Sequence, residues 1–413
     1  MSRLSLFLPP FAGDYSGVCS TLFKCDCLIV ILDAGCCTRN YVEYDEPRWK
    51  STRRSTFSAQ IRTLETTLGD ERSIIQQVVK AVSALSPACI GLVATPVPAI
   101  IGMDLDGLAL DVERECGIPT IGFSTTGFDT YEKGIALAFE KFSARFADNS
   151  TVNPATASNV FTPEDGIKFT VNLLGETPLD FFEQQGEHFV RNLQIQGIRV
   201  AFSAMNPFTP DTFAHLPKAD ANIVVSYGGL QAAKLLQHRF GQPYLPLCPF
   251  TSEIAGEIRR LLETIKSAPT AQTVCSPEEG FPILLIGDQV AMITVRSMLR
   301  CQNFFGRQCG PIIVASFFSM DSALLEQGDF QITSEPILSA YIEQNPRVHV
   351  LGDPLLKRIP GIGSHNLTEL THQAISSTLF THQSSTMYRQ IQIPLSDEQW
   401  NLVLKSLCQC NYQ

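Results

Sequence analysis

The segment 91–134, GLVATPVPAIIGMDLDGLALDVERECGIPTIGFSTTGFDTYEKG, decides the fold because it alternates between strand and helix signals. An apolar run over 91–95 is typical of the end of a buried strand, and the helical pattern of 101–117 follows a proline-containing turn. A second strand over 118–123 leads into the polar turn 124–127. This order predicts a parallel β-α-β unit, and such units bind ligands beyond the carboxyl ends of their strands. The loops that follow the two strands are therefore where we expect a functional site.

The same alternation continues along the chain and predicts an α/β protein. Apolar runs of strand length recur at 27–32, 89–93, 168–174, 199–202, 221–226, 282–286, 311–315 and 348–351, and helical patterns lie between most of them, among them 289–301 and 335–344. Strands separated by helices of ten to fifteen residues indicate parallel sheets covered on both faces. We therefore expect Rossmann-like α/β/α domains with mostly parallel sheets around a central cleft.

Two stretches rich in Ser, Thr, Asn and Pro with little periodicity, 147–163 and 266–282, predict domain boundaries. We expect an N-terminal domain at 1–155, a middle domain at 156–270 and a C-terminal domain at 271–413. The last of these ends in an amphipathic helix predicted from the capping signal at Ser396.

Composition excludes several classes of protein. The net charge is −10 and no dense Lys/Arg stripe is present, which argues against a nucleic-acid partner. The longest apolar run near the start, 28–32, is too short to span a membrane, and the first residues lack the apolar core of a signal peptide. We therefore expect a cytoplasmic protein with no membrane partner. In that reducing compartment the 13 cysteines are expected to be free thiols.

A pair of cysteines follows the first predicted strand. The strand 27–32 leads into the turn 33–37, DAGCC. A thiol directly after a buried strand is well placed to face a ligand. The alternative is that Cys36 and Cys37 are small residues filling a tight turn, and spacing alone favours it because no C-x-x-C partner lies nearby.

Further motifs share an order and spacing with a known family. They are PPFAG at 9–13, YSGV at 15–18, DAGCC at 33–37, TPVPAIIGMDL at 95–105, TTGF at 125–128, VNLLG at 171–175, IGD at 286–288 and LGDP at 351–354. Together they resemble the nitrogenase component 1 superfamily, the oxidoreductases that include the nitrogenase molybdenum–iron protein subunits and dark-operative protochlorophyllide reductase. The segment 44–49, YDEPRW, further resembles a compact branch of the family, shorter than the nitrogenase subunits.

The resemblance implies a function and a cofactor. In the family, cysteine thiolates near a subunit interface hold an iron–sulfur cluster that receives electrons from an ATP-dependent iron-protein reductase. The cluster expected here is of the 4Fe-4S type, which normally takes four thiolates. Of the family's cysteine positions only Cys37 is retained. The first would fall near Pro9 and the last near Thr95 or Pro96, and neither position holds a thiol.

The shortage of thiolates leaves several candidates for the remaining positions. Cys36, Asp14 and Cys19 are candidate ligands beside Cys37. A homodimer, or a heterodimer with a paralogous component 1-like chain, would supply the rest. Two threonines complete the candidate cofactor-binding residues. Thr95 occupies the second cysteine loop, and Thr126 lies in a polar turn before a helix, where it either binds an anionic group or serves as an ordinary cap.

The missing cysteines also support a second function on the same scaffold. It is a non-catalytic protein that binds or assembles a metal cofactor or a tetrapyrrole. No Walker A sequence is present, so ATP would have to be bound by a partner in either case.

Two more groups are weaker candidates. His372 lies after the last strand, where relatives present polar groups to their substrate. Asp45, Glu46 and Arg48 are expected to form ion pairs at a subunit interface, with Trp49 as a buried anchor.

Overall fold

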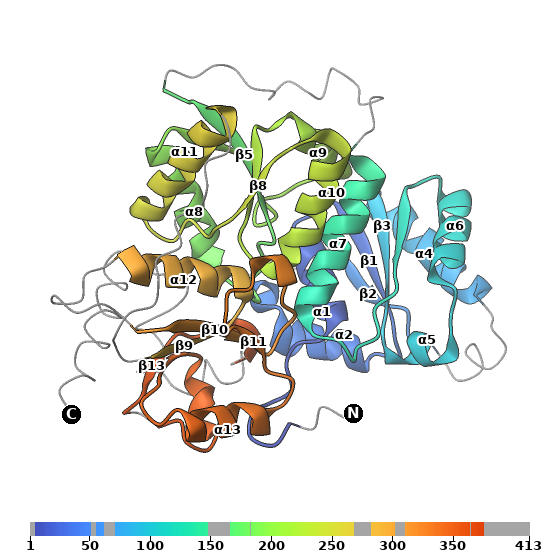
Figure 1. Ribbon diagram of the computed structural model, residues 1–413. Helices are drawn as coiled ribbons and strands as arrows, with labels where there is room; N and C mark the ends of the chain where they lie inside the picture. The colour runs from blue at the N-terminus through green and yellow to red at the C-terminus, as the bar shows by residue number, and fades with distance from the viewer. Residues whose placement is uncertain are drawn as a thin grey trace.

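The computed structural model describes residues 5–50, 55–61, 71–147, 166–181, 183–267, 282–301, 310–363 and 365–375. Three parallel sheets organise these residues (Figure 1), which confirms the predicted α/β class. The predicted domain boundaries at 155/156 and 270/271, and the predicted helix from Ser396, lie outside the described residues.

The N-terminal sheet has the order β2-β1-β3-β4, with all strands parallel. Its strands are β1 Cys27–Leu32, β2 Thr56–Ser58, β3 Cys89–Ala94 and β4 Thr120–Phe123. Every residue of β1 and β3 is buried, as expected when helices cover both faces. Alternate β1 side chains pack against two helix pairs, α4 Arg72–Leu85 with α6 Leu105–Cys116 on one face, and α1 Asp14–Leu22 with α7 Tyr131–Phe146 on the other.

The helix predicted over 101–117 begins later, as α6 Leu105–Cys116, and the proline-containing turn predicted before it is a short helix, α5 Pro96–Ile101. Prolines at the start of α5 fit a first helical turn, where no N–H is needed. Gly102 ends α5 with a left-handed φ of 69°, and the Asp104 side chain caps α6 by accepting a hydrogen bond from the Gly107 N–H at 3.0 Å.

The middle sheet has the order β6-β5-β7-β8 and is also parallel. Its strands are β5 Phe169–Leu174, β6 Ile198–Phe202, β7 Ala221–Val224 and β8 Tyr244–Pro246. Its helices are α8 Glu183–Ile195, α9 Pro210–Ala214, α10 Leu230–Phe240 and α11 Ser252–Ser267, with 3-10 turns at Leu216–Lys218 and Tyr227–Gly229.

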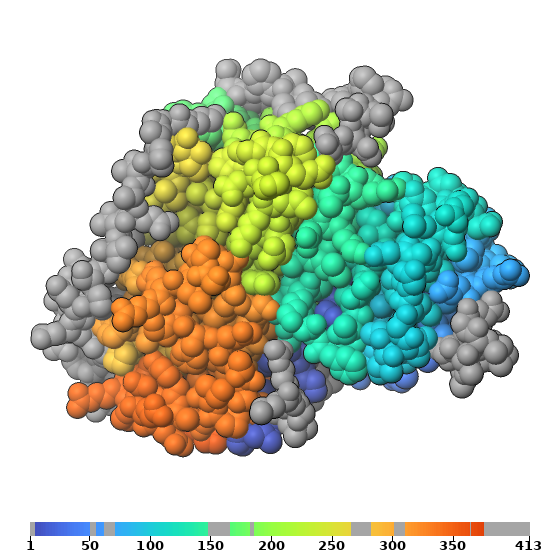
Figure 2. Space-filling view, turned by 45° about the vertical axis from the view of Figure 1, so that its right-hand side comes forward, coloured from blue at the N-terminus to red at the C-terminus, as the bar shows by residue number. Residues whose placement is uncertain are grey.

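The C-terminal sheet has the order β11-β10-β9-β12-β13, again parallel. Its strands are β9 Ile283–Ile286, β10 Ile312–Ser316, β11 Phe330–Gln331, β12 His349–Gly352 and β13 Leu367–Glu369. They are accompanied by α12 Gln289–Cys301, α13 Glu335–Gln344 and 3-10 turns at Ser322–Leu324 and Pro354–Arg358. The orange surface of this part meets both the middle and the N-terminal parts in Figure 2.

The three sheets meet around a buried polar contact. The Tyr131 hydroxyl of α7 donates a hydrogen bond to the Asp180 carboxylate. His372 Nε2 lies 3.3 Å from the Tyr131 hydroxyl and 3.4 Å from Asp180 Oδ1. All three side chains are buried, so His372 contributes here to packing between the three sheets.

Candidate functional site

The two adjacent cysteines lie at the carboxyl edge of the N-terminal sheet. After β1 the chain turns at Gly35, whose φ of 101° is left-handed, and enters the short helix α2 Cys36–Asn40. Cys36 is exposed and Cys37 is half-buried. Because neighbouring parallel strands end at the same edge, α2 lies on the same side of the sheet as α5, at the lower edge of the domain in Figure 1.

Cys37 contacts the loop that follows β3. Thr95 in this loop lies near enough to the thiol to lower its pKa. Thr95 Oγ1 in turn donates to the Leu32 carbonyl at 2.7 Å and so ties the ends of β3 and β1 together. Burial and the nearby Asp33 carboxylate raise the pKa of the Cys37 thiol. A metal ion would reverse that effect, because coordination deprotonates a thiol.

A polar group lies near the Cys37 thiol. It consists of Tyr15 and Ser16 on α1, Asn40 at the end of α2, and Asp45 at the end of the π-helical turn Tyr41–Asp45. Asn40 Nδ2 donates to the Tyr15 hydroxyl at 3.2 Å and to Asp45 Oδ2 at 3.0 Å. Ser16 Oγ also donates to Asp45 Oδ2, at 2.7 Å. Burial raises the pKa of Asp45 to about 6. Burial, together with the charges of Asp45 and Cys37, raises the pKa of Tyr15.

Asp14 and Thr126 form one structural contact. The Asp14 carboxylate accepts hydrogen bonds from the backbone N–H groups of Thr126 and Gly127, each at 2.7 Å, and from that of Tyr15 at 2.9 Å. The anion bound by the turn at Thr126 is therefore the protein's own carboxylate. The helix that follows, α7, begins only at Tyr131.

Cys19 lies in the core and not at the edge. It is fully buried on α1, where burial and the charges of Glu46, Asp33 and Asp45 raise its pKa well above the usual range. In the part of the chain that the structure describes, no group of three or more His, Cys, Asp or Glu side chains is arranged to hold a metal ion. The described edge thus presents two thiols, Cys36 and Cys37, whereas a 4Fe-4S cluster normally takes four thiolates.

The expected interface ion pairs are internal. Arg48 Nε and Nη2 donate to the two Glu46 carboxylate oxygens at 2.7 and 2.8 Å, and both side chains are buried. The guanidinium also lies 4.3 Å above the Phe23 ring, against which Trp49 packs edge-on. Asp45 bonds to Ser16 and Asn40 instead. The prediction of an interface role was wrong because α1 covers this segment within the chain.

Comparison with known proteins places the chain in a family. A family model described as nitrogenase component 1 type oxidoreductase matches residues 26–268, more than half of the chain. The chain belongs to this family. The resemblance predicted from the motifs is thereby confirmed.

Individual members of the nitrogenase component 1 family are distant. The chain is 23% identical over 240 residues to the nitrogenase molybdenum–iron protein alpha chain of Clostridium pasteurianum, covering 57% of this chain and 41% of the relative. It is 26% identical over 196 residues to the nitrogenase iron-molybdenum cofactor biosynthesis protein NifE of Klebsiella pneumoniae, covering 46% and 41%. A third relative is a component of the light-independent protochlorophyllide reductase of Bradyrhizobium sp. (strain ORS 278), 28% identical over 200 residues, covering 46% and 38%. The chain thus spans about two fifths of the length of these curated relatives.

The fold also matches a solved member. A structure of nitrogenase Cp1 at pH 6.5 superposes with a TM-score of 0.60 over 87% of this chain and 84% of that one, at 12% identity. At this identity the likeness shows the fold alone. None of the helices among the described residues has the length and apolar character needed to cross a membrane.

Proposed function

We propose that the chain is a subunit of a nitrogenase component 1-type oxidoreductase that works in the cytoplasm. It would take low-potential electrons from an ATP-dependent iron-protein reductase through an iron–sulfur cluster and deliver them to a small molecule or cofactor. The observation that carries the proposal is the pair Cys36 and Cys37, one exposed and one half-buried, at the carboxyl edge of the N-terminal sheet.

The residues at this edge fit half of a cluster site. Thiolates are soft, strongly donating ligands that suit iron–sulfur clusters, and a 4Fe-4S cluster normally takes four. One chain offers Cys36 and Cys37, so a pair of chains related by twofold symmetry would offer four. A paralogous chain with more cysteines would serve equally. Bound there, the cluster would supply one-electron transfer.

The surface around the thiols supports a partner chain. Ile100 on α5 is 72% exposed and Phe128, after β4, is 68% exposed. Val97 and Ile101 on α5 and Tyr44 are further exposed apolar side chains on segments of this edge. Several exposed large apolar side chains on one edge of a protein are typical of protein–protein interfaces. An interface here would bury the thiols and exclude water from the cluster.

The polar group behind Cys37 has a defined role in this proposal. Asp45 Oδ2 accepts hydrogen bonds from Ser16 and Asn40, and its pKa of about 6 lets it hold or release a proton near neutral pH. Asn40 in turn orients the Tyr15 hydroxyl. These side chains would balance the change of charge when the neighbouring thiolate site gains an electron.

A second candidate function is supported by Thr95. A thiol is missing at this position, which matches a cysteine loop of the family, and three relatives are named as cofactor biosynthesis proteins. A protein with a reduced set of thiolates would release a bound metal cofactor more readily than a catalytic subunit. The alternative is therefore a non-catalytic protein that binds or assembles a metal cofactor or a tetrapyrrole.

The test is anaerobic reconstitution with iron and sulfide, with and without a co-expressed paralogue. We expect stoichiometric iron and sulfide, and a paramagnetic signal after reduction by the iron protein with ATP. Cys37→Ala should lose most of the iron, whereas Cys116→Ala, which removes a half-buried thiol outside this edge, should keep it. Iron-free protein would contradict the electron-transfer function and the binding of an iron-containing cofactor, and would leave tetrapyrrole binding as the alternative. Bound iron that accepts no electrons would favour the assembly function.

A further inference from the structure

Asp33 joins the end of β1 to the turn that carries Cys36 and Cys37. The residue is 1% exposed, and its carboxylate accepts hydrogen bonds from two neighbouring elements. Thr38 on α2 donates its backbone N–H to Oδ2 at 2.8 Å and its hydroxyl to Oδ1 at 3.0 Å. The Ser58 hydroxyl, at the end of β2, donates to Oδ1 at 2.6 Å. One carboxylate thus links β1, β2 and α2.

The bonds to Thr38 hold the turn 34–37 between two fixed points. The first point is Asp33 itself. The second is the third residue of α2, whose N–H is among the four that a helix leaves without an internal partner. Between them Gly35 reverses the chain with its left-handed φ of 101°, a conformation that glycine adopts freely. Both cysteines lie inside this short closed path, so the carboxylate restricts where their thiols can move.

Hydrogen bonds also join the neighbouring strand ends at this edge. Ser58 connects β2 to β1 through Asp33, and the Ile61 N–H donates to the Asp33 carbonyl at 2.8 Å. Thr95 connects β3 to β1 through the Leu32 carbonyl. The Thr125 hydroxyl, after β4, donates to the carbonyl of Ala94, the last residue of β3, at 2.5 Å. The turn therefore starts from a fixed frame, and ligands on such frames are placed more precisely than ligands on free loops.

We propose that Asp33 is a positioning residue of the thiol site, whose carboxylate clamps the turn 34–37 so that Cys36 and Cys37 are in place at the edge of the sheet before any metal binds. The inference rests on the proposed function, in which these thiols are cluster ligands. Asp33 acts through the turn and does not bind the metal itself, because both of its carboxylate oxygens already accept hydrogen bonds.

A turn that is held in advance favours metal binding. Ordering a mobile turn costs conformational entropy, which the metal–sulfur bonds would otherwise have to offset. Removing a group that orients metal ligands in this way typically lowers metal affinity about 10–100-fold. The clamp thus predicts a loss of affinity in variants that keep both thiols.

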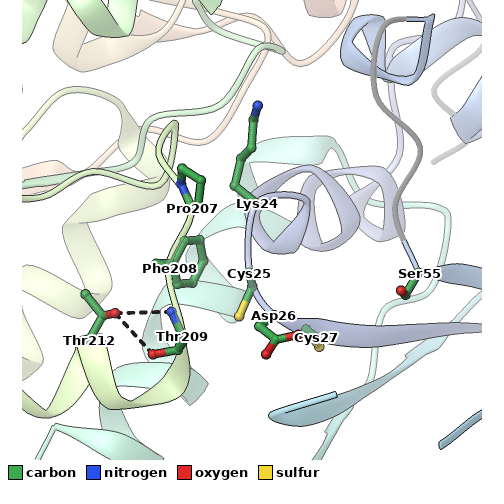
Figure 3. Close-up of a pocket in the computed structure, with 9 residues that line it drawn as sticks. All are labelled: Lys24, Cys25, Asp26, Cys27, Ser55, Pro207, Phe208, Thr209 and Thr212. Carbon is green, nitrogen blue, oxygen red and sulfur yellow. Dashed lines mark hydrogen bonds between the residues drawn. The ribbon is translucent and has the colours of Figure 1, made fainter. Parts of the chain in front are cut away.

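Variants of Asp33 and Thr38 separate geometry from charge. Asp33→Asn removes the charge and replaces one acceptor with a donor. Thr38→Val keeps the carboxylate and removes the hydroxyl that binds it, whereas Thr38→Ser keeps a hydroxyl and should behave as the wild type. The matched control is Asp26→Asn, because Asp26 is an exposed acid at the opposite, amino end of β1. Figure 3 shows it at the wall of a pocket of about 340 Å³.

The first measurement uses the metal-free, reduced chain. Alkylation with iodoacetamide and fragmentation of the peptides give separate rates for Cys36 and Cys37. In the wild type we expect the exposed Cys36 to react faster than the half-buried Cys37. In Asp33→Asn and Thr38→Val the ratio of the two rates should fall towards one. The fully buried Cys248 should stay unreactive in every variant that is folded.

The second measurement is an anaerobic titration with Co²⁺, followed through the absorption band of thiolate-to-metal charge transfer. Asp33→Asn should bind Co²⁺ about 10–100-fold more weakly than the wild type. Thr38→Val should also bind more weakly, and Thr38→Ser and Asp26→Asn should match the wild type. A residue that only stabilised the fold would leave the affinity of the folded chain unchanged.

The outcomes distinguish this inference from the proposed function. The positioning role is overturned if Asp33→Asn and Thr38→Val keep the wild-type alkylation rates, or if they bind Co²⁺ as tightly as Asp26→Asn. Either result leaves the proposed function standing. An effect in Asp33→Asn alone would assign it to charge and would equally overturn the clamp. If Asp33→Asn does not fold, Thr38→Val and Thr38→Ser decide. A wild-type chain that gives no thiolate band contradicts the proposed function, and the positioning role with it.

Discussion

Gly17 on α1 lies so close to α7 that a Cβ at this position would be 2.0 Å from the carbonyl oxygen of Tyr131. The contact is reciprocal, because a Cβ at Gly134 on α7 would be 1.8 Å from the carbonyl oxygen of Asp14. The two helices therefore cross backbone to backbone. This crossing sets the position of the start of α1, from which Asp14 and Tyr15 reach the edge with Cys37.

The first prediction concerns this crossing. Gly17→Ala should lower the free energy of unfolding by about 1–3 kcal/mol or more, because neither backbone can yield without moving a whole helix. Gly256→Ala on α11 is the control, since its Cβ would make only an ordinary contact, 3.8 Å from Gln196. It should be neutral or slightly stabilising, given the helix preference for Ala. Urea unfolding of both variants checks this, and equal stability would show that α1 and α7 are not tightly packed.

The second prediction concerns Asp14 as a structural anion. Asp14→Ala removes the acceptor for the N–H groups of Thr126 and Gly127 and should cost about 1–3 kcal/mol of stability. Asp106→Ala, which removes an exposed carboxylate paired with Lys141, should cost less than about 1 kcal/mol. The iron content of the folded Asp14→Ala variant distinguishes a structural role of Asp14 from a role as a cluster ligand. If Asp14 were a cluster ligand, its loss would lower bound iron in protein that is still folded.

The third prediction compares two ion pairs. Glu46→Ala leaves the buried Arg48 guanidinium without its carboxylate and should cost about 3–5 kcal/mol. Glu43→Ala breaks the exposed pair with Arg39 and should cost less than about 1 kcal/mol. Thermal unfolding of the wild type and of the two variants in the same buffer measures both losses of stability. A small loss for Glu46→Ala would mean that water reaches Arg48.

The sequence predicts those strands and helices that are determined by neighbouring residues in the chain. β1 was expected at 27–32, α12 at 289–301 and α13 at 335–344, and each has these bounds. Continuous apolar runs suffice for a strand buried on both faces, and capping residues with helical periodicity suffice for the helices. By contrast, the break between α5 and α6 depends on the left-handed backbone of Gly102, which ends α5 although the sequence pattern places this residue at the start of the helix predicted over 101–117.

The candidate site was predicted only in part, because its polar group is assembled over long distances. The position of Cys37 followed from the strand that precedes it. Tyr15, Asn40 and Asp45 were not singled out as a cluster, since they come together only through the crossing of α1 and α7 and the π-helical turn. The partner of Asp14, Thr126, is 112 residues away, and no local pattern indicates such a contact.

The fourth prediction is a pH dependence of stability that arises from Glu176. This carboxyl group is fully buried, accepts a hydrogen bond from Ser203, and has a pKa raised to about 8 by burial. The folded state therefore holds a proton that the unfolded state loses above its pKa of 4.5. The stability contributed by this group is complete below pH 4.5 and is lost as the pH rises to about 8, by at most about 1.4 kcal/mol per pH unit.

The variant Glu176→Gln tests this dependence because it cannot ionise. Its stability relative to the wild type should rise as the pH increases between 5 and 8, measured by urea unfolding at each pH. Glu113→Gln is the control, since this carboxylate is partly exposed and paired with Arg145. If the difference between Glu176→Gln and wild type did not change with pH, the carboxyl group would have to be solvated in the folded state.

The last prediction concerns the surface that would meet a partner chain. Ile100→Glu places a charge on the exposed apolar residues around Cys36 and Cys37, and it should weaken association with a second copy or a paralogue by at least about tenfold, or 1.4 kcal/mol. Leu110→Glu is the matched control, because Leu110 is 57% exposed but lies on α6. Sedimentation velocity measures association, and iron analysis after reconstitution measures the cluster. Because the described residues of one chain place two thiols at this edge, Ile100→Glu should lose iron together with the partner. Association and iron content equal to those of Leu110→Glu would place the subunit interface elsewhere.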